Sequence, residues 1–142
     1  MRYVNAKGLE YDQMLAKSLI GALMADQAIN NYLTPAVLDA GANRADNDAG
    51  TTVAGSAYTT MEHKWDEAYG YVFGLAPNPA EPLATLGNDD DFLNEYLYKV
   101  DQKPAFQGIA QKVFDAFKRG RAAIVAGQYG ERDAQAAIIQ RE

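Results

Sequence analysis

The chain has 142 residues, 48% of them hydrophobic, and its 13 basic and 19 acidic side chains give a net charge of −6. It contains no cysteine and one histidine, which excludes disulfide frameworks, cysteine-ligated metal sites and thiol catalysis. The acidic balance argues against a nucleic-acid partner, because proteins that bind phosphate backbones normally carry a clustered basic surface. The length and the hydrophobic fraction predict a single domain over residues 1–142.

The sequence predicts no transmembrane segment. Its most apolar stretch, residues 15–29, contains Lys17 and Asp26 and is too polar to span a bilayer. The first ten residues lack the apolar core of a signal peptide, so no export signal is expected in this chain.

The N-terminal third predicts one long helix, a short helix and a loop. Apolar residues recur at steps of three and four from Tyr11 to Leu33, which is typical of an amphipathic helix. Thr34 and Pro35 then fit the N-cap and first position of a short helix. Residues 39–58 are rich in Asp, Asn, Gly, Ala and Thr, and we expect them to form a long loop.

The second strong helix is predicted over residues 59–73. Thr59 and Glu62 form the Thr-x-x-Glu pattern of a capping box, and Gly74 follows as the C-terminal cap. Three prolines in residues 75–87 then predict an irregular segment.

Three further helices complete the predicted fold. The acidic triplet Asp89–Asp91 fits the N-cap of a helix that runs to about Lys99. A helix over residues 106–126 and a last helix from Glu131 follow, separated by a glycine-containing turn. No strand pattern is present, so we predict an all-α fold, an antiparallel bundle of four or five helices with long irregular loops.

Residues 61–71 form the densest polar and aromatic segment, and they contain the only histidine. On a helix, His63 lies beside Asp66, three residues on, and Glu67, four residues on. Helical bundles supply ligands to carboxylate-rich iron or manganese sites from Glu-x-x-His pairs, and the order here is His-x-x-Asp, in which the two side chains can still converge. We therefore predict His63, Asp66 and Glu67 as ligands of a divalent metal or iron, and identify no catalytic residue.

The alternative interpretation of this segment is structural. In that case His63 is a core residue that hydrogen-bonds an acidic neighbour or a carbonyl, while Trp65 and Tyr69 anchor the core. A similar choice applies to the arginines near the C-terminus. Arg119 and Arg121 point to different faces of their helix, so at most one of them is inward, and Arg132 lies near the same turn. An inward arginine needs a carboxylate partner, because an unpaired buried charge is very costly, so we predict inter-helix salt bridges rather than an anion site.

Residues 58–71 resemble the signature of an uncharacterised bacterial family, domain of unknown function 4856. Two further stretches are similar to the same family, residues 32–50 and residues 120–124 together with 131–135, so the resemblance extends over most of the chain.

That family is related to the imelysin-like proteins, which are helical proteins of the Gram-negative envelope linked to iron uptake and once described as metallopeptidases. Their motif is Gly-x-His-x-x-Glu. His63 matches its histidine, Asp66 stands in place of its glutamate and Met61 in place of its glycine. The resemblance implies a periplasmic or outer-membrane-associated protein with a lipid anchor, of which this chain is a truncated piece.

Three functions follow as expectations. The first is a non-enzymatic envelope binding module with a metal or small-ligand site around His63. The second is a metallohydrolase in which His63 and nearby carboxylates hold a metal that activates water. The third is a structural or protein-interaction domain, whose partners would be an envelope protein or further copies of the chain.

Overall fold

The computed structural model describes residues 4–89 and 93–142. Within these ranges the regular structure is helical, apart from one isolated bridge between Val4 and Glu10, and the predicted all-α fold is confirmed. In chain order the elements are α1 (Tyr11–Leu19), η1 (Ile20–Ala25), η2 (Gln27–Tyr32), α2 (Pro35–Leu38), α3 (Asn43–Asp48), α4 (Thr60–Phe73), η3 (Pro82–Thr85), α5 (Leu93–Asp101), α6 (Ile109–Val125) and α7 (Tyr129–Arg141).

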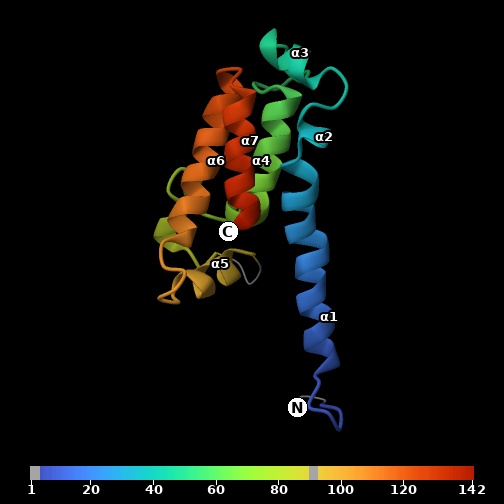
Figure 1. The fold of residues 1–142 in the computed structure, drawn as a ribbon, viewed down its shortest axis with the longest axis vertical. Coiled ribbons are helices and arrows are strands. Elements are labelled where there is room, and N and C mark those ends of the chain that lie inside the picture. The colour runs from blue at the N-terminus through green and yellow to red at the C-terminus, as the bar shows by residue number, and fades with distance from the viewer. Residues whose placement is uncertain (1–3, 90–92) are drawn as a thin grey trace.

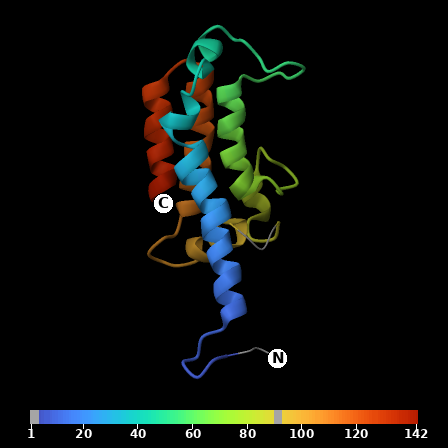
Figure 2. The ribbon, with the colours of Figure 1, turned by 90° about the vertical axis from the view of Figure 1, so that its right-hand side faces the viewer.

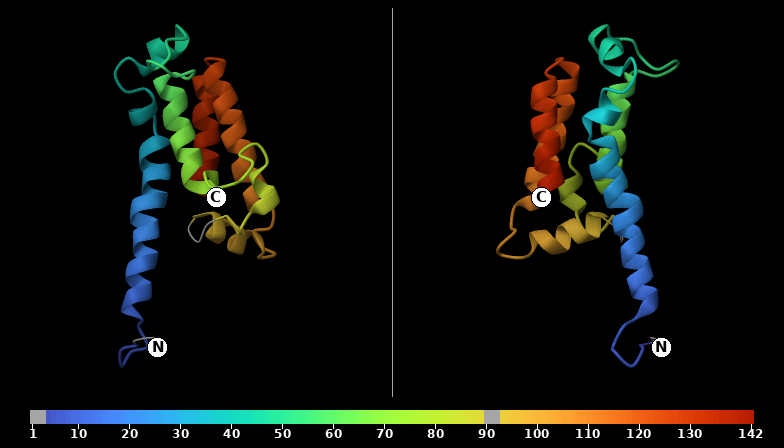
Figure 3. Two further views of the ribbon diagram at one scale, coloured as in Figure 1. Left: turned by 180° about the vertical axis from the view of Figure 1, so that it is seen from behind. Right: turned by 45° about the vertical axis from the view of Figure 1, so that its right-hand side comes forward.

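The first three elements form one long helix, as predicted, although η1 and η2 have wider π-type turns. Its C-terminal part packs against α4, and its N-terminal part extends beyond the end of the bundle (Figures 1 and 3). The projecting part carries exposed apolar side chains, including Leu15, Leu19 and Leu23. None of the described helices is both long and apolar enough to cross a membrane.

The bundle consists of the long helix, α4, α6 and α7. The long helix and α6 run in one direction while α4 and α7 run in the other, and α5 lies across the end of the bundle (Figures 1 and 2). Helices α6 and α7 lie side by side, because only the short turn at Gly127 joins them. The predicted antiparallel bundle of four or five helices is consistent with this arrangement.

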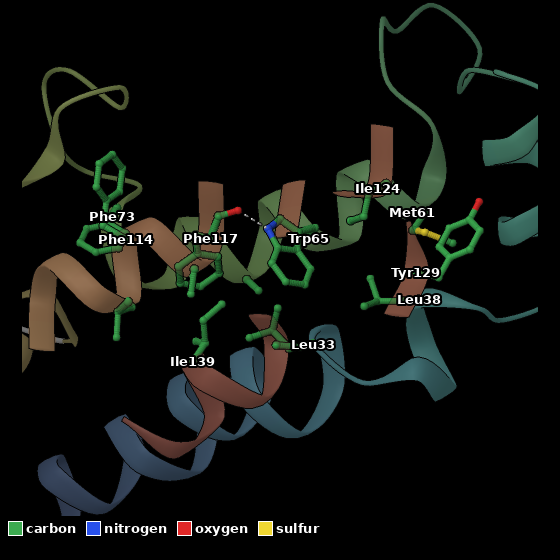
Figure 4. Close-up of a cluster of buried hydrophobic side chains, with 14 of the residues drawn as sticks. Leu33, Leu38, Met61, Trp65, Phe73, Phe114, Phe117, Ile124, Tyr129 and Ile139 are labelled. Atoms are coloured by element: carbon green, nitrogen blue, oxygen red, sulfur yellow. Dashed lines mark hydrogen bonds between the residues drawn. The ribbon is translucent and has the colours of Figure 1, made fainter. Parts of the chain in front are cut away.

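The core lies where α4, α6 and α7 meet the end of the long helix (Figure 4). Trp65 on α4 is almost completely buried, and its indole Nε1 donates a hydrogen bond of 3.0 Å to the carbonyl oxygen of Phe117 on α6. Gly120 makes this packing fit, because a Cβ atom at that position would lie 2.0 Å from Cζ2 of Trp65. The side chain of Phe117 meets the Trp65 ring edge-on.

The start of α4 confirms the predicted capping box. The backbone N–H of Glu62 donates to Oγ1 of Thr59 at 3.3 Å, and the backbone N–H of Thr59 donates to Oε2 of Glu62 at 2.6 Å. Thr34 and Pro35 likewise take the predicted first positions of α2, but the Thr34 hydroxyl donates to the carbonyl oxygen of Asn31 instead of capping the helix. Backbone geometry alone therefore starts α2.

Residues 39–58 are not one long loop, and that prediction is wrong for α3. Asn47 on α3 donates from Nδ2 to the carbonyl oxygen of Ile124 at 2.8 Å and accepts at Oδ1 from the Thr59 hydroxyl at 2.8 Å. These bonds join α3 to the ends of α4 and α6, which a composition of turn-forming residues cannot reveal.

The predicted boundaries elsewhere shift by a few residues. Helix α6 begins at Ile109, about three residues later than predicted, and α7 begins at Tyr129, two residues earlier. The segment predicted to be irregular contains the short helix η3. Asp90 and Asp91, two of the three predicted cap residues of α5, lie outside the described residues.

Arg132 on α7 is fully buried and confirms the prediction that an inward arginine pairs with carboxylates. Its Nη1 and Nη2 donate to Oδ1 and Oδ2 of Asp39 at 2.6 and 3.0 Å, and Nη2 lies 2.7 Å from Oδ1 of Asp133. The guanidinium also faces the Tyr129 ring at 5.2 Å. The pair joins α7 to the segment that follows α2.

Candidate functional site

His63 lies on α4 and is not a core residue, because 43% of its side chain is exposed. Its ring stacks on that of Tyr58, with ring centroids 4.9 Å apart and planes 12° apart. Its Nε2 lies 3.7 Å from Oε1 of Glu67, the partner expected four residues on. The interpretation of His63 as a core residue is therefore wrong, whereas Trp65 does anchor the core.

Glu67 faces the long helix. Its Oε2 accepts a hydrogen bond of 2.9 Å from Nζ of Lys64, and that Nζ also lies 5.2 Å from the centroid of the Tyr32 ring. Glu67 thus lies between two side chains, with one carboxylate oxygen bonded to the Lys64 ammonium and the other near the His63 imidazole.

Asp66 faces α6 instead, because it pairs with Arg121. Nε of Arg121 donates to Oδ1 of Asp66 at 3.0 Å, and Nη1 donates to Oε1 of Glu62 at 2.7 Å. These contacts confirm the predicted inter-helix salt bridge. One guanidinium therefore holds two carboxylates of α4 against α6.

The two carboxylates respond differently to the same arginine. Burial acts to raise the pKa of Glu62, but hydrogen bonds from the Thr59 backbone and from Arg121 outweigh it and lower the pKa. Burial also raises the pKa of Asp66, and the charge of Arg121 reduces this rise without reversing it. Glu62 is therefore the more firmly ionised member of the pair.

The three predicted metal ligands do not share one point in this structure. His63 and Glu67 approach each other, while Asp66 is bonded to Arg121. Among residues 4–89 and 93–142, no three or more His, Asp or Glu side chains are grouped so that they could hold a metal ion. The metal site at His63, Asp66 and Glu67 stays a prediction.

A cavity of about 580 Å³ opens next to the Asp66–Arg121 pair, between α4, α6 and residues 79–80. We call it the α4–α6 pocket. Its wall is mainly aromatic and aliphatic, with three charged side chains. The lining residues are Trp65, Asp66, Tyr69, Pro79, Ala80, Phe114, Phe117, Lys118, Arg121, Ala122 and Val125.

Tyr69 fixes residues 75–81 against α4, and this segment forms one side of the pocket. The Tyr69 hydroxyl donates to the carbonyl oxygen of Pro79 at 2.5 Å, and the Tyr69 ring meets that of Phe117 edge-on at 5.4 Å. Burial raises the pKa of Tyr69 to about 12, so the phenol stays neutral at physiological pH. It therefore acts as a fixed wall rather than as a proton donor that titrates near neutrality.

A second apolar groove, of about 220 Å³, lies on another side of the bundle. The long helix, α4, α5, α6 and α7 contribute to it, and its lining includes Ala28, Leu97 and Ile139. Its only charged lining residue is Glu142. The groove is smaller and less polar than the α4–α6 pocket.

The family model described as domain of unknown function 4856 matches residues 1–142. The chain belongs to this family. The resemblance seen in the sequence is thereby confirmed at the level of the family. No curated protein and no solved structure gives a significant match to the chain. The further relationship to imelysin-like proteins stays a prediction.

Residues 58–71, the segment whose sequence resembles the family, contribute to two places in this protein. One face of α4 carries His63 and Glu67, and another carries the Asp66 side chain that lines the α4–α6 pocket. Sequence reasoning identified Asp66 but not the pocket. The missing information was the path of residues 75–81. A proline-rich composition predicts that such a segment is irregular, but it does not predict where in the fold the segment lies. Lys118 and Arg121, one helical turn apart on α6, were the available signal.

Proposed function

We propose that the chain is a non-catalytic binding domain that holds a small ligand in the α4–α6 pocket. The observation that carries this proposal is the pocket itself. Its volume of about 580 Å³ lies in the range of small-molecule sites, which are typically apolar cavities with a few converging polar groups. Asp66, one of its lining residues, belongs to residues 58–71, the segment on which the resemblance to the family was based.

Binding is better supported than hydrolysis. The charged side chains of the pocket are one carboxylate, which Arg121 already holds, and two cations. His63, the only imidazole in the chain, is not among the lining residues. A hydrolase needs a base placed within hydrogen-bond reach of the reacting group, and the lining offers Asp66 alone for that role.

The test uses N-phenyl-1-naphthylamine, an uncharged aromatic probe that fluoresces in apolar sites. Ala122 is exposed and lines the pocket, so Ala122→Phe fills the cavity without changing the core. We expect one probe to bind per chain and Ala122→Phe to weaken binding by at least about tenfold, equivalent to roughly 1.4 kcal/mol.

The matched control is Ala134→Phe, which adds the same ring at an exposed position on α7 outside the lining. It should leave the affinity for the probe unchanged. Probe binding that survives Ala122→Phe, or that is lost equally in both variants, would contradict the proposal.

A second candidate function is a metal site at His63 and Glu67, favoured by the 3.7 Å between Nε2 and Oε1. Asp66 joins these two only if it leaves Arg121. For this candidate we expect heat on calorimetric titration with Zn²⁺, Mn²⁺ or Fe²⁺, and its loss in His63→Ala. The absence of heat with all three ions would rule this candidate out.

We also propose that this binding domain lies in the bacterial envelope and takes part in iron uptake. Both parts of this proposal rest on the resemblance of residues 61–66 to the imelysin-like motif, in which His63 and Asp66 take the two side-chain positions. A binding domain without catalysis is compatible with such a role. The α4–α6 pocket would then serve a ligand met outside the cytoplasm.

A further inference from the structure

The charges around the α4–α6 pocket are unlike those of the chain as a whole. The chain carries a net charge of −6, but two of the three charged side chains that line the pocket, Lys118 and Arg121, are cationic. Two carboxylates, Asp66 in the lining and Glu62 beside it, offset the charge of Arg121. Lys118 is therefore the side chain whose charge can attract an anionic ligand to this apolar cavity.

Lys118 has its charge free for a ligand. Its side chain is exposed, and Nζ lies 5.1 Å from the centroid of the Phe114 ring, at the aromatic wall of the pocket. Within the part of the chain that the structure describes, no carboxylate lies within salt-bridge distance of it. The ammonium group is therefore held at the rim by the ring alone.

Arg121 has unused hydrogen-bonding capacity on the same side. Its Nε and Nη1 donate to Asp66 and Glu62, whereas Nη2 donates to none of the described residues. A guanidinium presents five N–H groups, so two carboxylates do not exhaust it. The pairing also fixes the direction of Arg121, which lowers the entropy lost when a further anion binds.

The rest of the wall suits an apolar body. Four aromatic side chains line the pocket, Trp65, Tyr69, Phe114 and Phe117. Phe117 meets both Trp65 and Tyr69 edge-on. Such a surface favours a flat or branched apolar group by burial and by ring contacts.

We propose that the α4–α6 pocket binds small amphipathic anions, with the apolar body on the aromatic wall and one carboxylate or sulfonate beside Lys118 and Arg121. This inference rests on the proposed function, because it names the class of ligand for the same pocket. Ligands without the anionic group bind more weakly.

Two probes with the same apolar body distinguish the contribution of charge to binding from that of the apolar cavity. The anionic probe 1-anilinonaphthalene-8-sulfonate differs from N-phenyl-1-naphthylamine by its sulfonate. We expect Lys118→Gln to weaken binding of the anionic probe by about two- to fivefold, the range of a partly exposed ion pair, and to leave the neutral probe unchanged. The anionic probe alone should also lose affinity as the salt concentration rises.

Arg119→Gln is the matched control, because it removes one positive charge from an exposed position of α6 outside the lining. It should leave both affinities unchanged. An equal loss in Lys118→Gln and Arg119→Gln would overturn the inference, since only the net charge would then matter.

The two proposals fail in different ways. If the neutral probe binds and is lost in Ala122→Phe, but Lys118→Gln leaves the anionic probe unaffected, the pocket stands and the anion preference is wrong. If Ala122→Phe affects neither probe, the proposed function itself is wrong, and the anion preference fails with it.

Discussion

Gly120→Ala is expected to destabilise the protein by about 2–3 kcal/mol, although alanine is the better helix former by about 1 kcal/mol. The substitution destabilises rather than stabilises because of the neighbouring side chain, Trp65. A Cβ at position 120 would lie 2.0 Å from Cζ2 of Trp65, whose ring is buried and held by its hydrogen bond to the Phe117 carbonyl. The ring cannot move aside without breaking that bond. Urea denaturation monitored by circular dichroism measures the change.

Gly70→Ala provides the control for this prediction. Gly70 lies within α4, and a Cβ there would meet nothing within 4 Å. The substitution should therefore stabilise the protein by roughly 1 kcal/mol, the ordinary difference in helix propensity. Opposite signs for the two variants would confirm that Gly120 serves the Trp65 contact, and equal stabilisation by both would contradict it.

Asp39→Asn is expected to cost about 3 kcal/mol of stability. Arg132 is fully buried and Asp39 holds both of its terminal nitrogens, so the substitution removes the main charge that compensates the guanidinium. Asp133→Asn should cost less, because the Asp133 carboxylate is 44% exposed and solvent screens its contact with Arg132. Equal effects from the two variants, measured by urea denaturation at pH 7, would contradict this ranking.

The Asp39–Arg132 pair should also make the stability of the protein depend on pH. Hydrogen bonds from Arg132 hold the pKa of Asp39 below its usual value of 3.8. The unfolded chain therefore takes up the proton first as the pH falls, and the stability that Asp39 contributes is complete above pH 3.8 and is lost below it. Acidification from pH 5 to pH 2.5 should thus cost the wild type more stability than Asp39→Asn.

Much of the fold could be predicted because its signals are local. The long first helix follows from apolar spacing, and α4 follows from a capping box that the structure reproduces atom by atom. Helix α3 could not be predicted. Its residues favour turns, and the bonds of Asn47 go to Ile124 and Thr59, which are distant in the sequence.

The candidate site was predictable only in part for the same reason. Spacing on one helix placed Asp66 and Glu67 beside His63, and it placed Glu67 correctly. It could not show that Arg121, 55 residues further on, holds Asp66. Nor could it show that Lys118 faces an aromatic cavity, because that cavity exists only where residues 79–80 approach α6.

The central claim is that a ligand binds in the α4–α6 pocket, and amide chemical-shift mapping tests it most directly. Titration of ¹⁵N-labelled protein with 1-anilinonaphthalene-8-sulfonate should shift the amides of Asp66, Tyr69, Ala80 and Ala122, which line the pocket. Shifts confined to the second groove, at residues such as Ala28, Leu97 and Ile139, or the absence of any saturable shift, would contradict the account.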